Sequence, residues 1–190
     1  MNIEEDSSYQ KMINGEMYLE SKDLAGLRID VRTKLMDYNR IADSKTRNQN
    51  IKSLLKSAGD RFFVEPTFYF SYGVNLTIGN HFYANHDVML CDEGKITIGN
   101  DVKFGPKVGL YTPQHPLDPT IRRTEAETTA PITIGNDVWV GGSATILPGV
   151  TLGNNVIVGA GSVVTHSFPD NVIVVGNPAR VLRENKPAKK

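Results

Sequence analysis

The sequence predicts a parallel β-helix that is preceded by helices and interrupted by one long loop. The main observation is a spacing of six residues, at which buried-type aliphatic side chains recur without a miss: Ile134, Val140, Ile146, Leu152, Val158 and Val164. Glycine directly follows most members of this column, and side chains of modest size lie four positions after it. A period of six fits neither the 3.6-residue period of a helix nor the two-residue period of a strand.

A short strand followed by a turn, repeated every six residues, explains the column. Three such units would close a triangular coil of about 18 residues, and equivalent apolar side chains would stack at the strand spacing of roughly 4.8 Å. The pairs Asn136-Asp137 and Asn154-Asn155 each directly follow a glycine of the repeat. Glycine adopts positive φ easily and Asn tolerates it, so these residues are expected at the corners of the coils.

The composition and net charge of the chain limit the classes of binding partner. The chain has 190 residues, with 21 basic and 21 acidic side chains and a formal net charge of zero. Balanced charge disfavours a nucleic acid or a membrane surface as the partner, although a local basic cluster remains possible. Cys91 is the single cysteine and cannot form an internal disulfide, and no N-terminal apolar run resembles a signal peptide or a membrane span. We therefore expect a cytoplasmic protein.

Residues 1–60 are predicted to form a helical N-terminal cap. They contain no proline and many charged residues. A first helix is expected to begin near Ser7 or Ser8, because a serine can cap free backbone amides there. Apolar residues at steps of three and four predict two further helices over residues 23–42 and 46–58, the last ended by Gly59.

The β-helix is predicted over residues 61–178. It begins with the aromatic run FFVEPTFYFSYG, and the six-residue column then continues until a two-residue slip at residues 92–95, which predicts a small outward loop. The column is absent over residues 111–131 and resumes at Ile132. An excursion of this length from a tight solenoid is typical of a functional loop. Residues 179–190 form a basic tail, with Arg180, Arg183, Lys186, Lys189 and Lys190. Such a tail or the N-terminal helices would cover an end of the solenoid.

His115 is the first candidate for chemistry. It opens the excursion within the stiff segment TPQHP, where a neutral imidazole could accept a proton from a hydroxyl. A zinc site is the alternative, since four histidines are present. His81 and His86 are five residues apart and neither lies a whole number of coils from His115, so we predict no metal site.

Several segments together resemble the maltose and galactoside O-acetyltransferases, a group of hexapeptide-repeat acyltransferases. They are MING at residues 12–15, EPTF at 65–68, FSYG at 70–73, FYAN at 82–85, TPQHP at 112–116, residues 134–141, and GNPAR at 176–180. The resemblance implies a left-handed β-helix and a homotrimer with active sites between neighbouring copies. It also implies transfer of acetyl from acetyl-coenzyme A to a sugar hydroxyl, with no permanently bound cofactor.

The resemblance also implies roles for individual residues. His115 matches the catalytic base. The acceptor would be bound by Ser71, Tyr83, Asn85 and an acid of the Asp92-Glu93 pair, with Glu20 and Arg28 contributing from the cap. Carboxylates and amides side by side suit a neutral acceptor rich in hydroxyls. Which of Asp92 and Glu93 faces the acceptor is left open.

Coenzyme A needs a groove of exposed backbone for its arm and cations for its phosphates. The candidates are Trp139, Gly141, Gly142, Ser143, Ala160, Gly161, Thr165, His166, Arg180 and Arg183. Two of them depart from the family pattern, because Gly142 replaces a donor such as serine and His166 replaces a lysine.

Two other hypotheses stay open at this point. The acceptor could be another small molecule, such as an antibiotic, an amino sugar or serine. The chain could also be a trimeric β-helix scaffold without catalytic activity.

Overall fold

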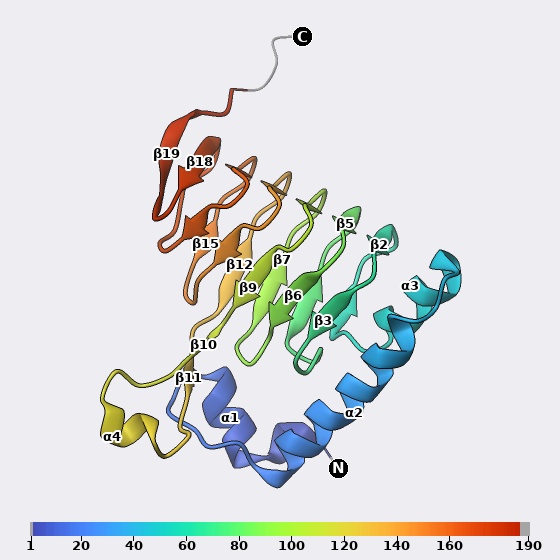
Figure 1. The fold of residues 1–190 in the computed structure, drawn as a ribbon, viewed down its shortest axis with the longest axis vertical. Helices are drawn as coiled ribbons and strands as arrows, with labels where there is room; N and C mark the ends of the chain where they lie inside the picture. Colours follow the sequence, from blue (N-terminus) through green and yellow to red (C-terminus); the bar gives the residue numbers. More distant parts are fainter. Residues whose placement is uncertain (1, 187–190) are drawn as a thin grey trace.

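The structure is a computed structural model that describes residues 2–186, most of which form a parallel β-helix (Figure 1). The first sheet contains β1 (Ser57–Ala58), β4 (Leu76–Ile78), β7 (Ile96–Ile98), β12 (Ile132–Ile134) and β15 (Thr151–Leu152). The second contains β2 (Phe62–Val64), β5 (Phe82–Ala84), β8 (Lys103–Phe104), β13 (Trp139–Val140), β16 (Ile157–Val158), β18 (Val172–Gly176) and β19 (Ala179–Glu184). The third contains β3 (Phe68–Phe70), β6 (Val88–Cys91), β9 (Gly109–Tyr111), β14 (Thr145–Ile146) and β17 (Val163–Val164).

The strand register confirms the predicted coil in the C-terminal half. Thr133 pairs with Thr151, 18 residues later. In the N-terminal half the repeat is 20 residues, as in the pairing of Thr77 with Thr97. The two extra residues lie where the chain passes from the third sheet to the first, once after β3 and once after β6, whereas only the second slip was predicted. We call this edge the loop-bearing corner, because the long excursion between β9 and β12 leaves the solenoid there as well.

The predicted column is the core of the solenoid. All six of its residues in the C-terminal half are buried. In the N-terminal half the column stays mostly aliphatic, and aromatic rings pack beside it: the ring centroid of Phe82 lies 5.8 Å from that of Phe62 and 5.3 Å from that of Phe104. Larger side chains fill the larger 20-residue coils.

Asparagines hold one corner of the coils. Asp137 and Asn155 have positive φ, as expected for corner residues. The side-chain oxygen of Asn136 accepts the backbone N–H of Asn100 at 2.8 Å, and that of Asn154 accepts the backbone N–H of Asn136 at 2.9 Å. This ladder satisfies backbone donors that the turn would otherwise leave unpaired.

The N-terminal segment is helical, with boundaries that differ from those predicted. It contains η1 (Ile3–Glu5), α1 (Ser7–Ile13), α2 (Lys22–Tyr38) and α3 (Ser44–Lys52). Asp6, not a serine, caps α1, since its carboxylate accepts the N–H of Tyr9 at 2.7 Å. Asp43 caps α3, which begins at Ser44, two residues before the predicted start. The predicted end of this helix was wrong, because Ser57 and Ala58 pair with β4 as strand β1.

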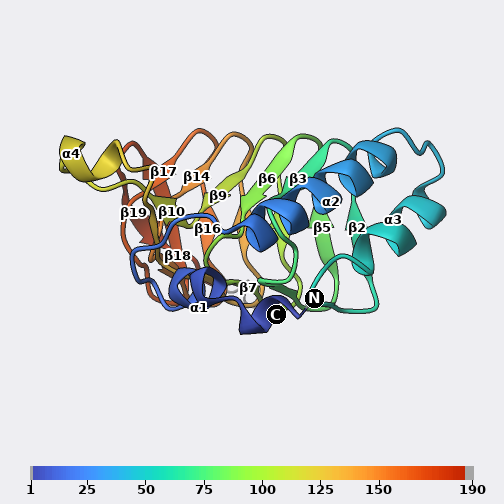
Figure 2. The same ribbon diagram turned by 90° about the horizontal axis from the view of Figure 1, so that it is seen from below.

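Helices α2 and α3 pack on the first coil, and the views in Figures 1 and 2 both place them at that end of the solenoid. Leu35 and Tyr38 of α2 and Ile51 of α3 belong to the same apolar core as the strands. A second apolar cluster joins Tyr9 and Met12 of α1 to Leu24 of α2 and to Tyr72, which follows β3. The cap is therefore attached along two separate faces.

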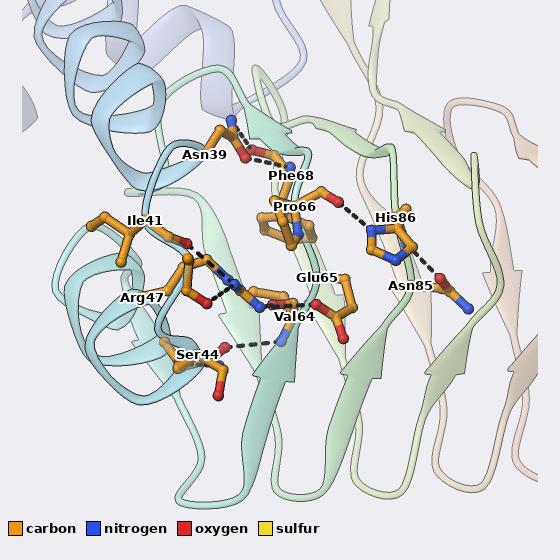
Figure 3. A network of polar contacts seen from close by, with 12 residues as sticks. Asn39, Ile41, Ser44, Arg47, Val64, Glu65, Pro66, Phe68, Asn85 and His86 are labelled. Carbon is orange, nitrogen blue, oxygen red and sulfur yellow. Dashed lines mark hydrogen bonds and ion pairs between the residues drawn. The ribbon is translucent and has the colours of Figure 1, made fainter.

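Polar contacts fix α3 and the end of α2 to the turn between β2 and β3 (Figure 3). Arg47 is buried, and its guanidinium pairs with the carboxylate of Glu65 at 2.9 Å while donating to the carbonyls of Ile41 and Val64. The side-chain amide of Asn39 accepts from and donates to the backbone of Phe68. These bonds replace strand pairing at the open end of the second and third sheets.

The excursion contains β10 (Pro113–Gln114), α4 (Pro119–Arg122) and β11 (Thr128–Thr129). Strands β10 and β11 pair antiparallel and hold the base of the loop, which projects from the solenoid beside α1 (Figures 1 and 2). At the other end, β18 and β19 form an antiparallel hairpin over the last coil. Of the predicted basic tail, Lys189 and Lys190 lie outside the described residues. Over residues 2–186, no helix is both long enough and apolar enough to span a membrane.

Candidate active site

A pocket of about 520 Å³ lies between the cap, the excursion and the loop-bearing corner. Its walls come from the segment that joins α1 to α2, from α2, from the two slipped turns and from the excursion. The lining residues are Tyr18, Leu19, Glu20, Arg28, Tyr72, Glu93, Glu125 and Glu127. Predicted acceptor residues Glu20, Arg28 and Glu93 are therefore brought together.

His115 lies at this pocket. Its Nε2 atom is 3.5 Å from Oε1 of Glu127, and half of its side chain is exposed. The segment between α1 and α2 positions Glu127, because Tyr18 and Glu127 exchange two backbone hydrogen bonds of 3.0 Å. The hydroxyl of Tyr18 also donates to Oε2 of Glu127 at 2.9 Å. The imidazole thus lies beside a fixed carboxylate of the pocket wall.

Glu20 and Arg28 form a two-point ion pair on the cap side. Nε of Arg28 lies 2.7 Å from Oε1 of Glu20, and a terminal nitrogen lies 2.6 Å from Oε2. The Tyr72 hydroxyl donates to Oε1 of Glu20 at 3.1 Å. Hydrogen bonding to Arg28 lowers the pKa of Glu20, so this carboxylate is ionised at neutral pH.

Asp92 is not in the pocket. It is fully buried, and its carboxylate accepts the backbone N–H groups of Ser71, Tyr72 and Gly73 at 2.7 to 2.8 Å. Burial raises the pKa of Asp92 to about 7, and the three donors act in the opposite direction. The outward loop predicted at residues 92–95 is therefore wrong at its first residue, since Asp92 points inward and ties together the preceding turn.

Glu93 is the member of the pair that reaches the pocket. Burial raises the pKa of its carboxyl group. Among the described residues, Oε2 of Glu93 is buried without a hydrogen-bond partner. Ser71 lies next to this wall, in a smaller groove that it shares with Arg28 and Cys91.

Tyr83 and Asn85 lie elsewhere. Tyr83 is on β5 of the second sheet, where its ring stacks on Phe63 with centroids 6.0 Å apart. Asn85 follows β5 at the corner between the second and third sheets, and its side-chain oxygen accepts the N–H of His86 (Figure 3). The strands of the third sheet separate these two residues from the loop-bearing corner.

Half of the residues predicted for coenzyme A share that second corner, which we call the glycine corner. Gly141, Gly142 and Ser143 follow β13, and Ala160 and Gly161 follow β16 one coil later. A Cβ on Gly141 would lie 2.6 Å from the backbone nitrogen of Ala160, whereas one on Gly161 would meet no atom within 4 Å. Neighbouring coils are in close contact at this corner, and the surface beside Gly161 is open.

The remaining candidates lie on the second sheet and at the loop-bearing corner. Trp139 on β13 is 55% exposed, which is unusual for a tryptophan in a strand. Arg180 and Arg183 lie on β19 with exposed side chains. Thr165 and His166 follow β17, at the far end of the loop-bearing corner, and are also exposed.

The histidines away from the pocket have local partners. Nδ1 of His81 lies 2.8 Å from the carboxylate of Asp101, and Nδ1 of His86 contacts the carbonyl of Pro66 (Figure 3). Within residues 2–186 no group of three His, Cys, Asp or Glu side chains is arranged to hold a metal ion.

Five pocket residues were not predicted from the sequence: Tyr18, Leu19, Tyr72, Glu125 and Glu127. Glu125 and Glu127 lie in the excursion that was predicted to be functional, so their position was a usable signal. The sequence around Tyr18 contains no such signal, because the position of Tyr18 depends on pairing with Glu127, more than a hundred residues later in the chain.

Comparison with known proteins decides the family. Residues 11–59 match the maltose acetyltransferase hexapeptide capping motif, and residues 131–166 match the bacterial transferase hexapeptide (six repeats). The chain is 41% identical to the galactoside O-acetyltransferase of Escherichia coli over 159 residues, 83% of this chain and 78% of the relative. The chain belongs to the maltose and galactoside O-acetyltransferase family.

Solved structures of this O-acetyltransferase family share the whole fold. A maltose O-acetyltransferase from Clostridium difficile 630 superposes with a TM-score of 0.93 and 35% identity, covering 96% of this chain and 99% of that one. A galactoside acetyltransferase in complex with coenzyme A gives a TM-score of 0.91 and 36% identity, covering 95% and 92%. As a member of this family, the protein is an O-acetyltransferase, and the predicted fold class and resemblance are confirmed.

Proposed function

We propose that the protein transfers acetyl from acetyl-coenzyme A to a hydroxyl of a sugar of the maltose, glucose or galactoside type, with His115 as general base. The observation that carries the proposal is the place of His115 at the lip of a pocket walled by carboxylates and tyrosine hydroxyls. Such groups suit a molecule rich in hydroxyls. The relatives named above supply the class of acceptor and, in one structure, coenzyme A.

The proposed reaction is a direct transfer. The acceptor hydroxyl gives its proton to the neutral imidazole of His115 as its oxygen attacks the thioester carbonyl. The carbon–sulfur bond then breaks, and the imidazolium returns the proton to the departing thiolate. General-base assistance of this kind contributes roughly 10² to 10⁴ in rate. Alignment of the two substrates and hydrogen-bond donors facing the developing oxyanion supply the remainder.

The acceptor is proposed to lie against Glu93 and the Glu20–Arg28 pair. Arg28 holds Glu20 at two points, so the pair presents a fixed row of donors and acceptors. Asp92 supports this wall without touching the acceptor, since its carboxylate is occupied by three backbone N–H groups.

Coenzyme A is proposed to lie along the glycine corner, with its phosphates near Arg180 and Arg183. The open backbone at Gly161 suits the pantetheine arm, and exposed guanidinium groups suit phosphate. Of the two departures from the family pattern, His166 stands in place of a permanent positive charge, at the loop-bearing corner after β17.

The site is proposed to be completed by a second copy of the chain, in a homotrimer. Within one chain, His115 and its pocket lie at the loop-bearing corner, whereas Asn85, Trp139 and the glycines lie across the third sheet. Two neighbouring solenoids would bring these corners together. Exposed apolar side chains on the second and third sheets, Phe63, Tyr69, Met89 and Trp139, support burial against another copy.

The experiment is release of free thiol from acetyl-coenzyme A on addition of maltose, glucose or a galactoside. The proposal expects sugar-dependent release that is lost in His115→Ala. Release with serine or an antibiotic but with no sugar would replace the acceptor class. No binding of acetyl-coenzyme A by calorimetry would support a non-catalytic scaffold instead.

A further inference from the structure

The pocket beside His115 has an excess of negative charge. Four carboxylates line it, those of Glu20, Glu93, Glu125 and Glu127, against the single guanidinium of Arg28. A site for a neutral sugar needs acceptors and donors in balance, and three carboxylates in excess leave mutual repulsion uncompensated.

Arg28 does not offset this excess. Both of its contacts go to Glu20, at 2.7 and 2.6 Å, so this pair is neutral by itself. Among residues 2–186, Glu93 and Glu125 take part in no ion pair, and Glu127 has only His115, at 3.5 Å. His115 must be neutral to act as a base, and then it brings no charge to Glu127.

Glu93 gives an independent sign of a missing partner. Its Oε2 atom is buried and accepts no hydrogen bond from any described residue. A buried acceptor without a donor is costly, and a charged one more so. Burial raises the pKa of this carboxyl group, and the charge of Arg28 opposes the shift without reversing it.

We propose that the pocket selects an acceptor that carries a protonated amine near the hydroxyl to be acetylated, as an amino sugar does. The ammonium group faces the carboxylates of Glu93, Glu125 and Glu127, while the hydroxyl faces His115. The inference rests on the proposed O-acetyl transfer and specifies its acceptor. A protonated amine has no lone pair, so the oxygen remains the nucleophile and the product is an ester.

Glucosamine and glucose test this directly, since they differ only in an amino group in place of one hydroxyl. The measurement is kcat/KM for each sugar by thiol release, at a pH where the amine is protonated, with the acetylated atom identified by NMR. Glucosamine is expected to be favoured by about tenfold, the effect of 1.4 kcal/mol from one ion pair. Glu127→Gln and Glu125→Gln are expected to reduce this preference toward unity.

Glu5→Gln is the matched control, because Glu5 is an exposed residue of η1 that does not line the pocket. It should leave the preference unchanged. Equal or better use of glucose, acetylation on nitrogen, or equal losses for both sugars in Glu127→Gln would overturn the inference while the proposed function stands. If neither these sugars nor maltose or a galactoside releases thiol, the proposed function fails and the inference fails with it.

Discussion

Oε1 of Glu127 lies 3.5 Å from Nε2 of His115, and Oε2 of the same carboxylate accepts the hydroxyl of Tyr18 at 2.9 Å. These three residues come from the two ends of the excursion and from the segment before α2. The coils alone therefore do not make the pocket. It exists because the cap and the excursion meet beside the loop-bearing corner.

Replacement of Asp92 should weaken the fold more than its position in a loop suggests. In Asp92→Ala, three buried backbone N–H groups lose their acceptor, and the free energy of unfolding is expected to fall by on the order of 3 kcal/mol or more. Urea unfolding followed by circular dichroism measures this change.

Asp92→Asn is the matched variant. Its remaining oxygen can still accept from Ser71 and Tyr72, which both bind Oδ1, and only the bond from Gly73 to Oδ2 is lost. Its loss of stability should be clearly smaller. Equal stability of the alanine and asparagine variants would contradict the supporting role of this carboxylate.

A site shared between two copies predicts complementation. His115→Ala removes a group at the loop-bearing corner, and Asn85→Ala removes one across the third sheet. Each variant alone should have little activity, whereas unfolding and refolding them together should restore a fraction of it. Activity returns at interfaces where the Asn85→Ala chain supplies His115 and the His115→Ala chain supplies Asn85.

The control for this experiment is a mixture of two variants from the same corner, His115→Ala and Arg28→Ala. In any mixed oligomer of this pair, each site takes its loop-bearing corner from a single chain. That chain lacks either His115 or Arg28, so activity should stay low. Two results would contradict the shared site. One is recovery of activity in this control mixture. The other is no recovery of activity in the mixture of His115→Ala with Asn85→Ala, although mixed oligomers form, which would place the whole site in one chain.

Removal of the cations on β19 should weaken the binding of acetyl-coenzyme A. Arg180→Ala and Arg183→Ala are expected to raise KM for acetyl-coenzyme A with kcat little changed, because the phosphates are far from the reacting carbonyl. The effect should shrink with added salt. Lys45→Ala, an exposed cation of α3, is the control. A fall in kcat at unchanged KM would contradict phosphate binding by these residues.

The column at Ile134 to Val164 predicted the solenoid because one side chain per strand fills a narrow prism, and this constraint is local and strictly periodic. Helix ends were less predictable, since Asp6 and Asp43 compete with nearby serines as caps. The pocket depended on contacts between distant segments. Glu127 meets Tyr18 by backbone pairing, and no local pattern in either segment indicates the other.

The roles of the two adjacent acids show the same limit. Asp92 and Glu93 are equivalent candidates in the sequence, yet one closes the preceding turn from inside and the other lines the pocket. The difference arises because the two extra residues after β3 place three N–H groups of residues 71–73 around the carboxylate of Asp92. Such a turn is visible only once the coils are stacked.

The role of His115 as acceptor of the hydroxyl proton can be tested by its removal. Sugar-dependent thiol release from acetyl-coenzyme A is compared between the wild type and His115→Ala, with circular dichroism and the oligomeric state as checks on folding. The expected result is a loss of roughly 10² to 10⁴ in kcat with fold and assembly intact. Unchanged kcat in the folded variant would contradict it.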